Sequence, residues 1–168
     1  MNVLSWIVFI GASIVAGAII FSFFVSLTYN PDGVKNLYRG LDLSALYNYD
    51  KYQYINLVSF IISIYVLKAY ISYQLVRIFL KLNIVNPFSK DVATIISRIS
   101  YVALGIGVLI LIGSGYAEWL AKKGVDMPGI HDILGGAGEH LFFGGIVLII
   151  SLVFNRGIEI QSENELTI

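Results

Sequence analysis

The chain has 168 residues, of which 57% are hydrophobic and 13% charged, against roughly a quarter charged in an ordinary soluble domain. This composition excludes an ordinary soluble globule and predicts an all-α integral membrane protein. The 11 basic residues balance the 11 acidic ones, which argues against direct nucleic-acid binding, and the absence of cysteine excludes disulfides and thiolate metal sites.

Four apolar segments are each long enough to cross a bilayer as a helix, which takes about 20 residues. They cover about residues 3–27, 54–80, 92–120 and 133–154. The fourth has a short apolar core, so it must recruit the glycine-rich residues 133–140, and an interfacial or re-entrant start remains open. We predict a single domain over residues 1–168, a compact bundle of four transmembrane helices. Within this range, residues 155–168 are expected to form an amphiphilic acidic tail in the cytoplasm.

Orientation is predicted from the distribution of lysine and arginine, which are enriched in cytoplasmic loops. The linker between the second and third segments is short and basic, with Arg77, Lys81, Lys90 and Arg98. The first and third connections carry a similar number of basic residues spread among many acids. We therefore expect a multi-pass membrane protein with both termini and this linker in the cytoplasm.

The second segment carries a polar face within its apolar run. Its members recur at three- and four-residue steps: Asn56, Ser59, Ser63, Tyr70, Gln74, Arg77 and Lys81. Unsatisfied polar groups are costly in hydrocarbon, so we expect this face to look into the bundle or into a hydrated cavity.

Lys68 lies beside this face near the middle of the segment, where a charge costs about 3 kcal/mol or more. One hypothesis makes it a ligand or ion contact, together with Tyr65, Ser72, Gln74 and Arg77. The alternative is that its long side chain extends toward the cytoplasmic interface. We expect no carboxylate deep in another segment to pair with it.

The two histidines flank the start of the fourth segment. His131, Glu139 and His140 offer ligands for zinc, but they do not repeat at a helical turn and form no HExxH motif. We interpret them as solvated interface residues and predict no metal and no cofactor. No Ser/His/Asp constellation is readable either, so the sequence predicts a non-enzymatic protein.

Small residues recur along the first and third segments and favour close helix packing. They include Ser13, Gly17, Ser22, Ser26, Gly105, Gly107 and Gly113. The same faces are compatible with a homo-oligomer in the lipid bilayer.

Short motifs flank the third and fourth segments. Asn86, Pro87, Phe88 and Ser89 precede the third, and the chain closes on Glu163, Asn164, Glu165, Leu166, Thr167 and Ile168. With the four-segment layout, these motifs resemble the bacterial membrane family named domain of unknown function twenty-nine seventy-five. The resemblance implies no activity, but it implies a partner, because members are often encoded beside a small helix-turn-helix repressor. We expect these motif residues other than Asn164 to contact that partner. The resemblance also implies a location in the bacterial cytoplasmic (inner) membrane.

Three functional hypotheses follow. The first is a regulatory or sensory membrane protein that acts on a cytoplasmic helix-turn-helix transcription factor. The second is a small transporter, channel subunit or immunity-type protein that uses the polar face of the second segment. The third, an intramembrane metalloenzyme, requires a metal bound to His131, Glu139 and His140.

Overall fold

A computed structural model describes residues 2–81 and 89–165 of the chain. These residues form helices and no strand: α1 (Asn2–Thr28), η1 (Pro31–Asn36), α2 (Ser44–Tyr49), α3 (Lys51–Lys81), α4 (Lys90–Lys122), α5 (Ile130–Ile133) and α6 (Ala137–Glu165). In this described part, α1, α3, α4 and the region of α5 and α6 are the four long apolar stretches with the length and composition of membrane spans. The predicted all-α bundle is therefore confirmed.

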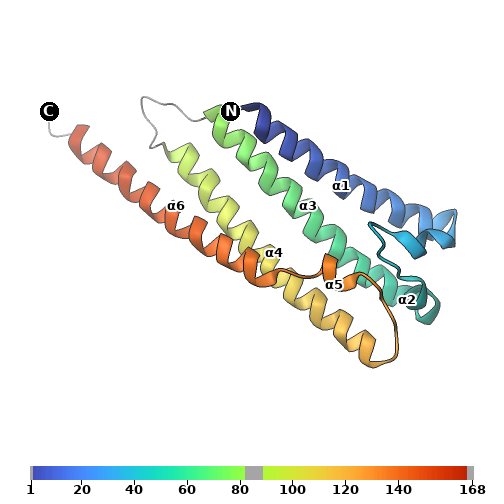
Figure 1. The fold of residues 1–168 in the computed structure, drawn as a ribbon. Helices are drawn as coiled ribbons and strands as arrows, with labels where there is room; N and C mark the ends of the chain where they lie inside the picture. Colours follow the sequence, from blue (N-terminus) through green and yellow to red (C-terminus); the bar gives the residue numbers. More distant parts are fainter. Residues whose placement is uncertain (1, 82–88, 166–168) are drawn as a thin grey trace.

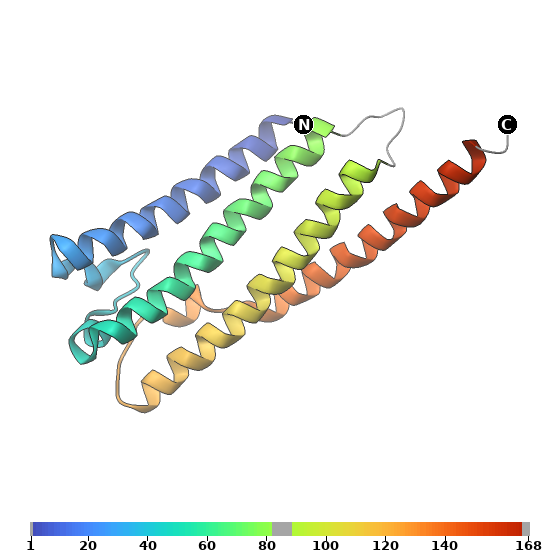
Figure 2. The same cartoon turned by 180° about the vertical axis from the view of Figure 1, so that it is seen from behind.

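The long helices follow one another in space in the order α1, α3, α4, α6 (Figure 1). α3 packs between α1 and α4, and α4 packs between α3 and α6. The view from behind shows the same order (Figure 2). The start of α1, the end of α3, the start of α4 and the end of α6 lie at one end of the molecule, while η1 and α2 lie at the other. We call the latter the loop end.

The loop end has a closely packed apolar core. Leu37, Leu41, Leu43 and Leu46 are at most 1% exposed and pack with the buried Tyr54 of α3. The Tyr54 hydroxyl shares a 2.7 Å hydrogen bond with the Ser26 hydroxyl of α1. The Asp42 backbone N–H donates to the Pro128 carbonyl at 3.1 Å. The first and third connections are thereby fixed to each other and to the long helices.

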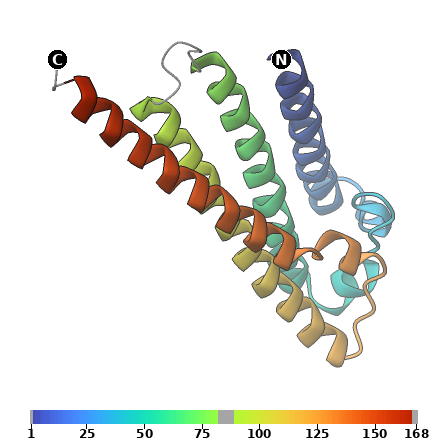
Figure 3. The ribbon, with the colours of Figure 1, turned by 60° about the vertical axis from the view of Figure 1, so that its left-hand side comes forward.

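The start of α6 lies about halfway along α4. After Lys122 the chain turns back beside α4, forms α5, and begins α6 at Ala137 (Figure 3). A Cβ added to Gly107 would lie 3.2 Å from the Ala137 carbonyl oxygen. Gly107 precedes the end of α4 by fifteen residues, which corresponds to about 22 Å of helix. α6 therefore starts partway along α4 and not at the level where α4 ends.

The boundaries of α6 differ from the expected residues 133–154 at both ends. Gly136 has a φ of +78°, a left-handed conformation that a right-handed helix cannot contain, so the helix starts after it. At the other end the helix continues without a break to Glu165. The described part of the expected acidic tail is consequently the last part of α6, where Arg156 pairs with Glu159 at 2.6 Å.

Small residues bring α4 and α6 into close backbone contact along a line that we call the α4–α6 seam. A Cβ added to Gly144 would lie 2.9 Å from the backbone nitrogen of Leu104. The Ser100 hydroxyl donates to the Gly144 carbonyl at 3.0 Å, and the hydroxyls of Ser97 and Ser151 are hydrogen-bonded to each other. Of the predicted packing positions, Gly107 belongs to this seam, whereas added Cβ atoms on Gly17 and Gly105 would meet open space. Self-association through those two positions stays a prediction.

Candidate functional site

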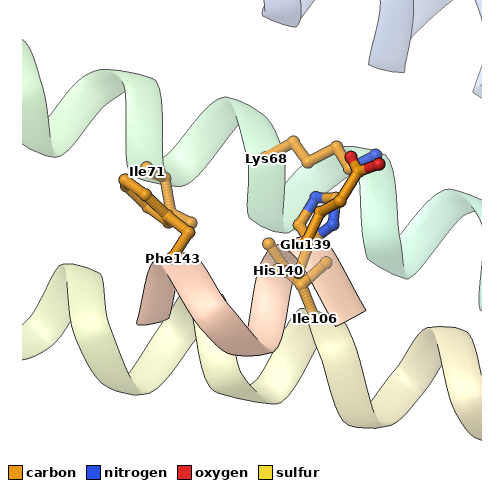
Figure 4. A pocket seen from close by; sticks show the side chains of 6 residues that line it. All are labelled: Lys68, Ile71, Ile106, Glu139, His140 and Phe143. Atoms are coloured by element: carbon orange, nitrogen blue, oxygen red, sulfur yellow. The ribbon is translucent and has the colours of Figure 1, made fainter. Parts of the chain in front are cut away.

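A cavity of about 300 Å³ lies between α3, α4 and α6, roughly halfway along α3 and α4 and at the start of α6. We call it the central cavity. Figure 4 shows the six side chains that line it, which are Lys68 and Ile71 from α3, Ile106 from α4, and Glu139, His140 and Phe143 from α6. Its charged groups come from two helices far apart in the sequence.

Lys68 is held in place by aromatic side chains. Its ammonium lies 5.2 Å from the centroid of the Tyr65 ring, a cation–π contact. The Tyr65 ring packs edge-on against Tyr38 at 5.9 Å, and the Arg39 guanidinium lies 5.4 Å from the centroid of the Tyr38 ring. Since Tyr65 is one turn toward the start of α3, the Lys68 side chain points away from the expected cytoplasmic end. The alternative in which it extends toward that end is therefore not the conformation observed.

Glu139 supplies the carboxylate that the sequence analysis did not find. The carboxylate and the Lys68 ammonium lie on the same side of the central cavity and are within Coulombic range of each other (Figure 4). No ion pair or hydrogen bond joins the two groups among the described residues. The expectation was that no carboxylate lies deep in another segment to pair with Lys68, because Glu139 was placed at the membrane interface. In the structure Glu139 lies near Lys68, although these two described residues form no ion pair. The start of α6 partway along α4 brings it to the level of Lys68.

His140 has a defined orientation. Its Nδ1 atom lies 2.9 Å from the Gly136 carbonyl oxygen. Because a carbonyl only accepts hydrogen bonds, Nδ1 carries the hydrogen in this contact, and Nε2 of the neutral ring is left as an acceptor. The site thus combines a three-donor ammonium with a carboxylate and an imidazole acceptor.

The weak metal candidates are divided between two places. His131, on α5, lines a surface pocket with Glu118 and Asp126, whereas Glu139 and His140 line the central cavity. Over residues 2–81 and 89–165, no three His, Cys, Asp or Glu side chains are grouped so that they could hold a metal ion. The geometry gives the metalloenzyme hypothesis no support.

The predicted polar face of α3 has two different environments. In its second half, Gln74 is fully buried, donates to the Tyr70 hydroxyl at 3.0 Å and accepts from Arg77 at 3.2 Å. In its first half, Asn56, Ser59 and Ser63 are exposed, and the two serine hydroxyls donate to backbone carbonyls of their own helix. The first half of the face therefore does not point into the core of the bundle. Its polar residues line another open cavity together with Leu109 and Tyr116 of α4, in keeping with the alternative that the face looks into a cavity.

The ligand candidates therefore have different roles. Lys68 lines the central cavity and Tyr65 positions it, whereas the Ser72 hydroxyl donates to the Lys68 carbonyl at 3.0 Å. Gln74 and Arg77 belong to the hydrogen-bonded chain described above. Sequence reasoning missed the cavity walls formed by Ile71, Ile106 and Phe143, since apolar residues on three helices carry no individual signal.

Of the predicted partner contacts, those that the structure describes lie at the end opposite the loop end. Ser89 caps α4 by accepting a hydrogen bond from the Val92 N–H at 3.3 Å. Glu163 is exposed on the last turns of α6, and the backbone of Glu165 ends that helix. The other predicted contacts lie outside the described residues, namely Asn86, Pro87, Phe88, Leu166, Thr167 and Ile168.

Comparison with protein families gives one match. Residues 39–168 match the family described as protein of unknown function (DUF2975). The chain belongs to this family. The suspected resemblance is thereby confirmed over most of the chain, which includes α2 to α6 and all residues of the central cavity. Comparisons with curated proteins and with solved structures gave no match.

Proposed function

We propose that this DUF2975 member is a non-enzymatic, multi-pass protein of the bacterial cytoplasmic membrane that regulates a cytoplasmic helix-turn-helix transcription factor. In this proposal, occupancy of the central cavity changes the position of α6, and the end of α6 contacts the regulator. The observation that carries it is the continuity of α6 from the cavity to the tail.

α6 is one helix of 29 residues, with Glu139 and His140 in its first turns and Glu163 in its last. At about 1.5 Å per residue it spans about 43 Å. An unbroken helix moves as a unit, so a shift at the cavity is transmitted to the far end. Beyond Arg156 the described residues are exposed or half-buried, and the exposed ones include Ile160 and Ser162, which offer surface to a partner.

The proposed orientation places the end of the molecule with both chain termini in the cytoplasm. The basic residues Arg77, Lys81, Lys90 and Arg98 lie toward that end, as expected for a cytoplasmic side. The loop end with its tyrosines then faces outward. A cysteine-accessibility experiment on Ser162→Cys and Asp32→Cys tests this assignment, because the chain has no native cysteine. We expect an impermeant thiol reagent to label only the second variant in intact cells.

Co-purification tests the regulatory function directly. The full-length chain and a version ending at Arg156 are isolated from native membranes at equal abundance, and bound proteins are identified by mass spectrometry. We expect a helix-turn-helix protein with the full-length chain and at least a tenfold loss with the shortened one. Equal recovery with both versions contradicts a contact in the tail, and absence of such a protein from both contradicts the proposed function.

A second candidate function is transport or channel activity, alone or as a subunit. It is favoured by the two opposite charges of Lys68 and Glu139, which lie halfway along α3 and α4, and by the start of α6 at the same level. Lys68→Leu would then alter solute flux into reconstituted vesicles at unchanged protein abundance. Lys122→Leu, at an exposed lysine at the end of α4, is the matched control. Unchanged flux in Lys68→Leu removes this candidate.

A further inference from the structure

The charges of the central cavity are balanced but not bonded to each other. Lys68 brings one positive charge and Glu139 one negative charge, and the described structure contains no ion pair between them. The ammonium is left with donors, and the carboxylate and the His140 Nε2 atom are left as acceptors. A ligand that fits must accept a hydrogen bond from Lys68 on one side and donate a hydrogen bond to Glu139 or His140 on the other.

The cavity is open to the side of the helix bundle. α3 forms one wall and α6 the other, α4 supplies the floor through Ile106, and α3 and α6 are separated by α4 along most of their length. Because the opening lies halfway along helices of membrane-spanning length, it faces hydrocarbon in the proposed location. The ligand therefore enters from the bilayer and carries an apolar part.

The walls match an apolar chain beside a small polar head. Ile71 and Phe143 extend from the charged groups along α3 and α6, and the Phe143 side chain is 45% exposed at the outer edge. A volume of about 300 Å³ equals that of about ten water molecules, which accommodates a head the size of glycerol and the first carbons of its chains.

The balance of charge selects the kind of head. An anion would compensate Lys68 and leave Glu139 without an opposite charge, and a cation would do the reverse. Either state is costly away from water, and a zwitterion brings two further charges out of water. A hydroxyl group has neither cost, since its oxygen accepts from Lys68 while its hydrogen is donated to Glu139 or to His140.

We propose that the central cavity binds an uncharged, hydroxyl-bearing lipid of the diacylglycerol type, with the hydroxyl between Lys68 and Glu139 and the acyl chains along Ile71 and Phe143. This inference depends on the proposed function, for which it names the ligand class. It extends that function to a sensor of neutral lipid in the membrane.

Photolabelling in defined bilayers tests the proposal. The full-length protein is reconstituted in phosphatidylcholine nanodiscs with a diacylglycerol that carries a diazirine near the head end of one acyl chain. Labelled peptides are identified by mass spectrometry. We expect labelling on α3 and α6 around Ile71 and Phe143, with unlabelled diacylglycerol competing at least fivefold better than triacylglycerol with the same chains.

Matched variants locate the site. Lys68→Met and Glu139→Gln should each reduce specific labelling at least fivefold, whereas Lys122→Met and Glu118→Gln, at exposed positions of α4, should leave it unchanged. Phe143→Trp narrows the cavity without removing a charge and should also reduce labelling. Thermal unfolding of each variant separates lost binding from lost folding.

Three results would overturn the proposal: equal competition by triacylglycerol, stronger competition by phosphatidylethanolamine or phosphatidylglycerol, or unchanged labelling in both charge variants. The second of these would reassign the cavity to a charged headgroup. Failure here is distinguishable from failure of the regulatory function, because co-purification of the regulator is measured separately. If the regulator still co-purifies but no lipid competes preferentially, only the proposed ligand class is contradicted, and the regulatory function is not.

Discussion

α6 meets its two neighbours in opposite ways. Along the α4–α6 seam, glycines and serines allow backbone atoms to approach closely, and side-chain hydroxyls bond across the contact. Toward α3, long side chains and a cavity occupy the space instead. The seam holds α6 against α4, α6 does not pack closely against α3 at this level, and the space between α3 and α6 is the central cavity.

The largest expected effect comes from overfilling the seam. Gly144→Leu places a Cβ against the backbone nitrogen of Leu104, which cannot move without shifting α4. We expect a loss of about 1 to 3 kcal/mol in the free energy of unfolding, measured by denaturant titration in detergent. Gly145→Leu is the matched control, because its added Cβ meets nothing within 4 Å. Equal losses in the two variants would mean that the seam is not closely packed.

A smaller effect is expected from removing one hydrogen bond of the seam. Ser100→Ala leaves the buried Gly144 carbonyl without the hydroxyl that donates to it. The expected loss in the free energy of unfolding is about 1 kcal/mol. Ser114→Ala, in which the hydroxyl donates only within α4, serves as the control. A loss no larger than that of the control would contradict a stabilising contact between the helices.

Across the central cavity, a double-mutant cycle measures the interaction between the charges of Lys68 and Glu139. We expect Lys68→Met and Glu139→Gln to be coupled by about 0.5 to 1 kcal/mol, because the groups attract each other without a direct bond. The free energies of unfolding of both single variants and the double variant give the coupling. Strictly additive effects would show that the two charges do not interact.

The smallest effect on the free energy of unfolding is expected at the edge of the central cavity. His140→Ala removes a hydrogen bond to the Gly136 carbonyl in a half-exposed position. The expected loss is about 0.5 kcal/mol in the free energy of unfolding, while lipid labelling should fall if the imidazole acceptor is used. A loss as large as that of Gly144→Leu would indicate that the start of α6 depends on this contact.

The sequence predicted some of the site and missed the rest for identifiable reasons. A lysine within an apolar run can be recognised from the sequence because the cost of burying its charge depends only on the neighbouring residues, so Lys68 was found. Glu139 belongs to a glycine-rich stretch that also fits an exposed loop, and nothing in that stretch shows that α6 starts partway along α4. The exposed Ser59 and the buried Gln74 share one face of α3, so helical periodicity alone could not distinguish their environments.

The sequence by itself determined the number of long helices, their approximate limits and the presence of an unpaired charge, because these depend on composition and local periodicity. Only the tertiary structure decided what that charge faces. The position of α6 depends on contacts such as Gly144 with Leu104, which join residues 40 positions apart and leave no periodic signal. The central cavity arises from that placement, since its lining comes from three helices whose relative heights are set by packing.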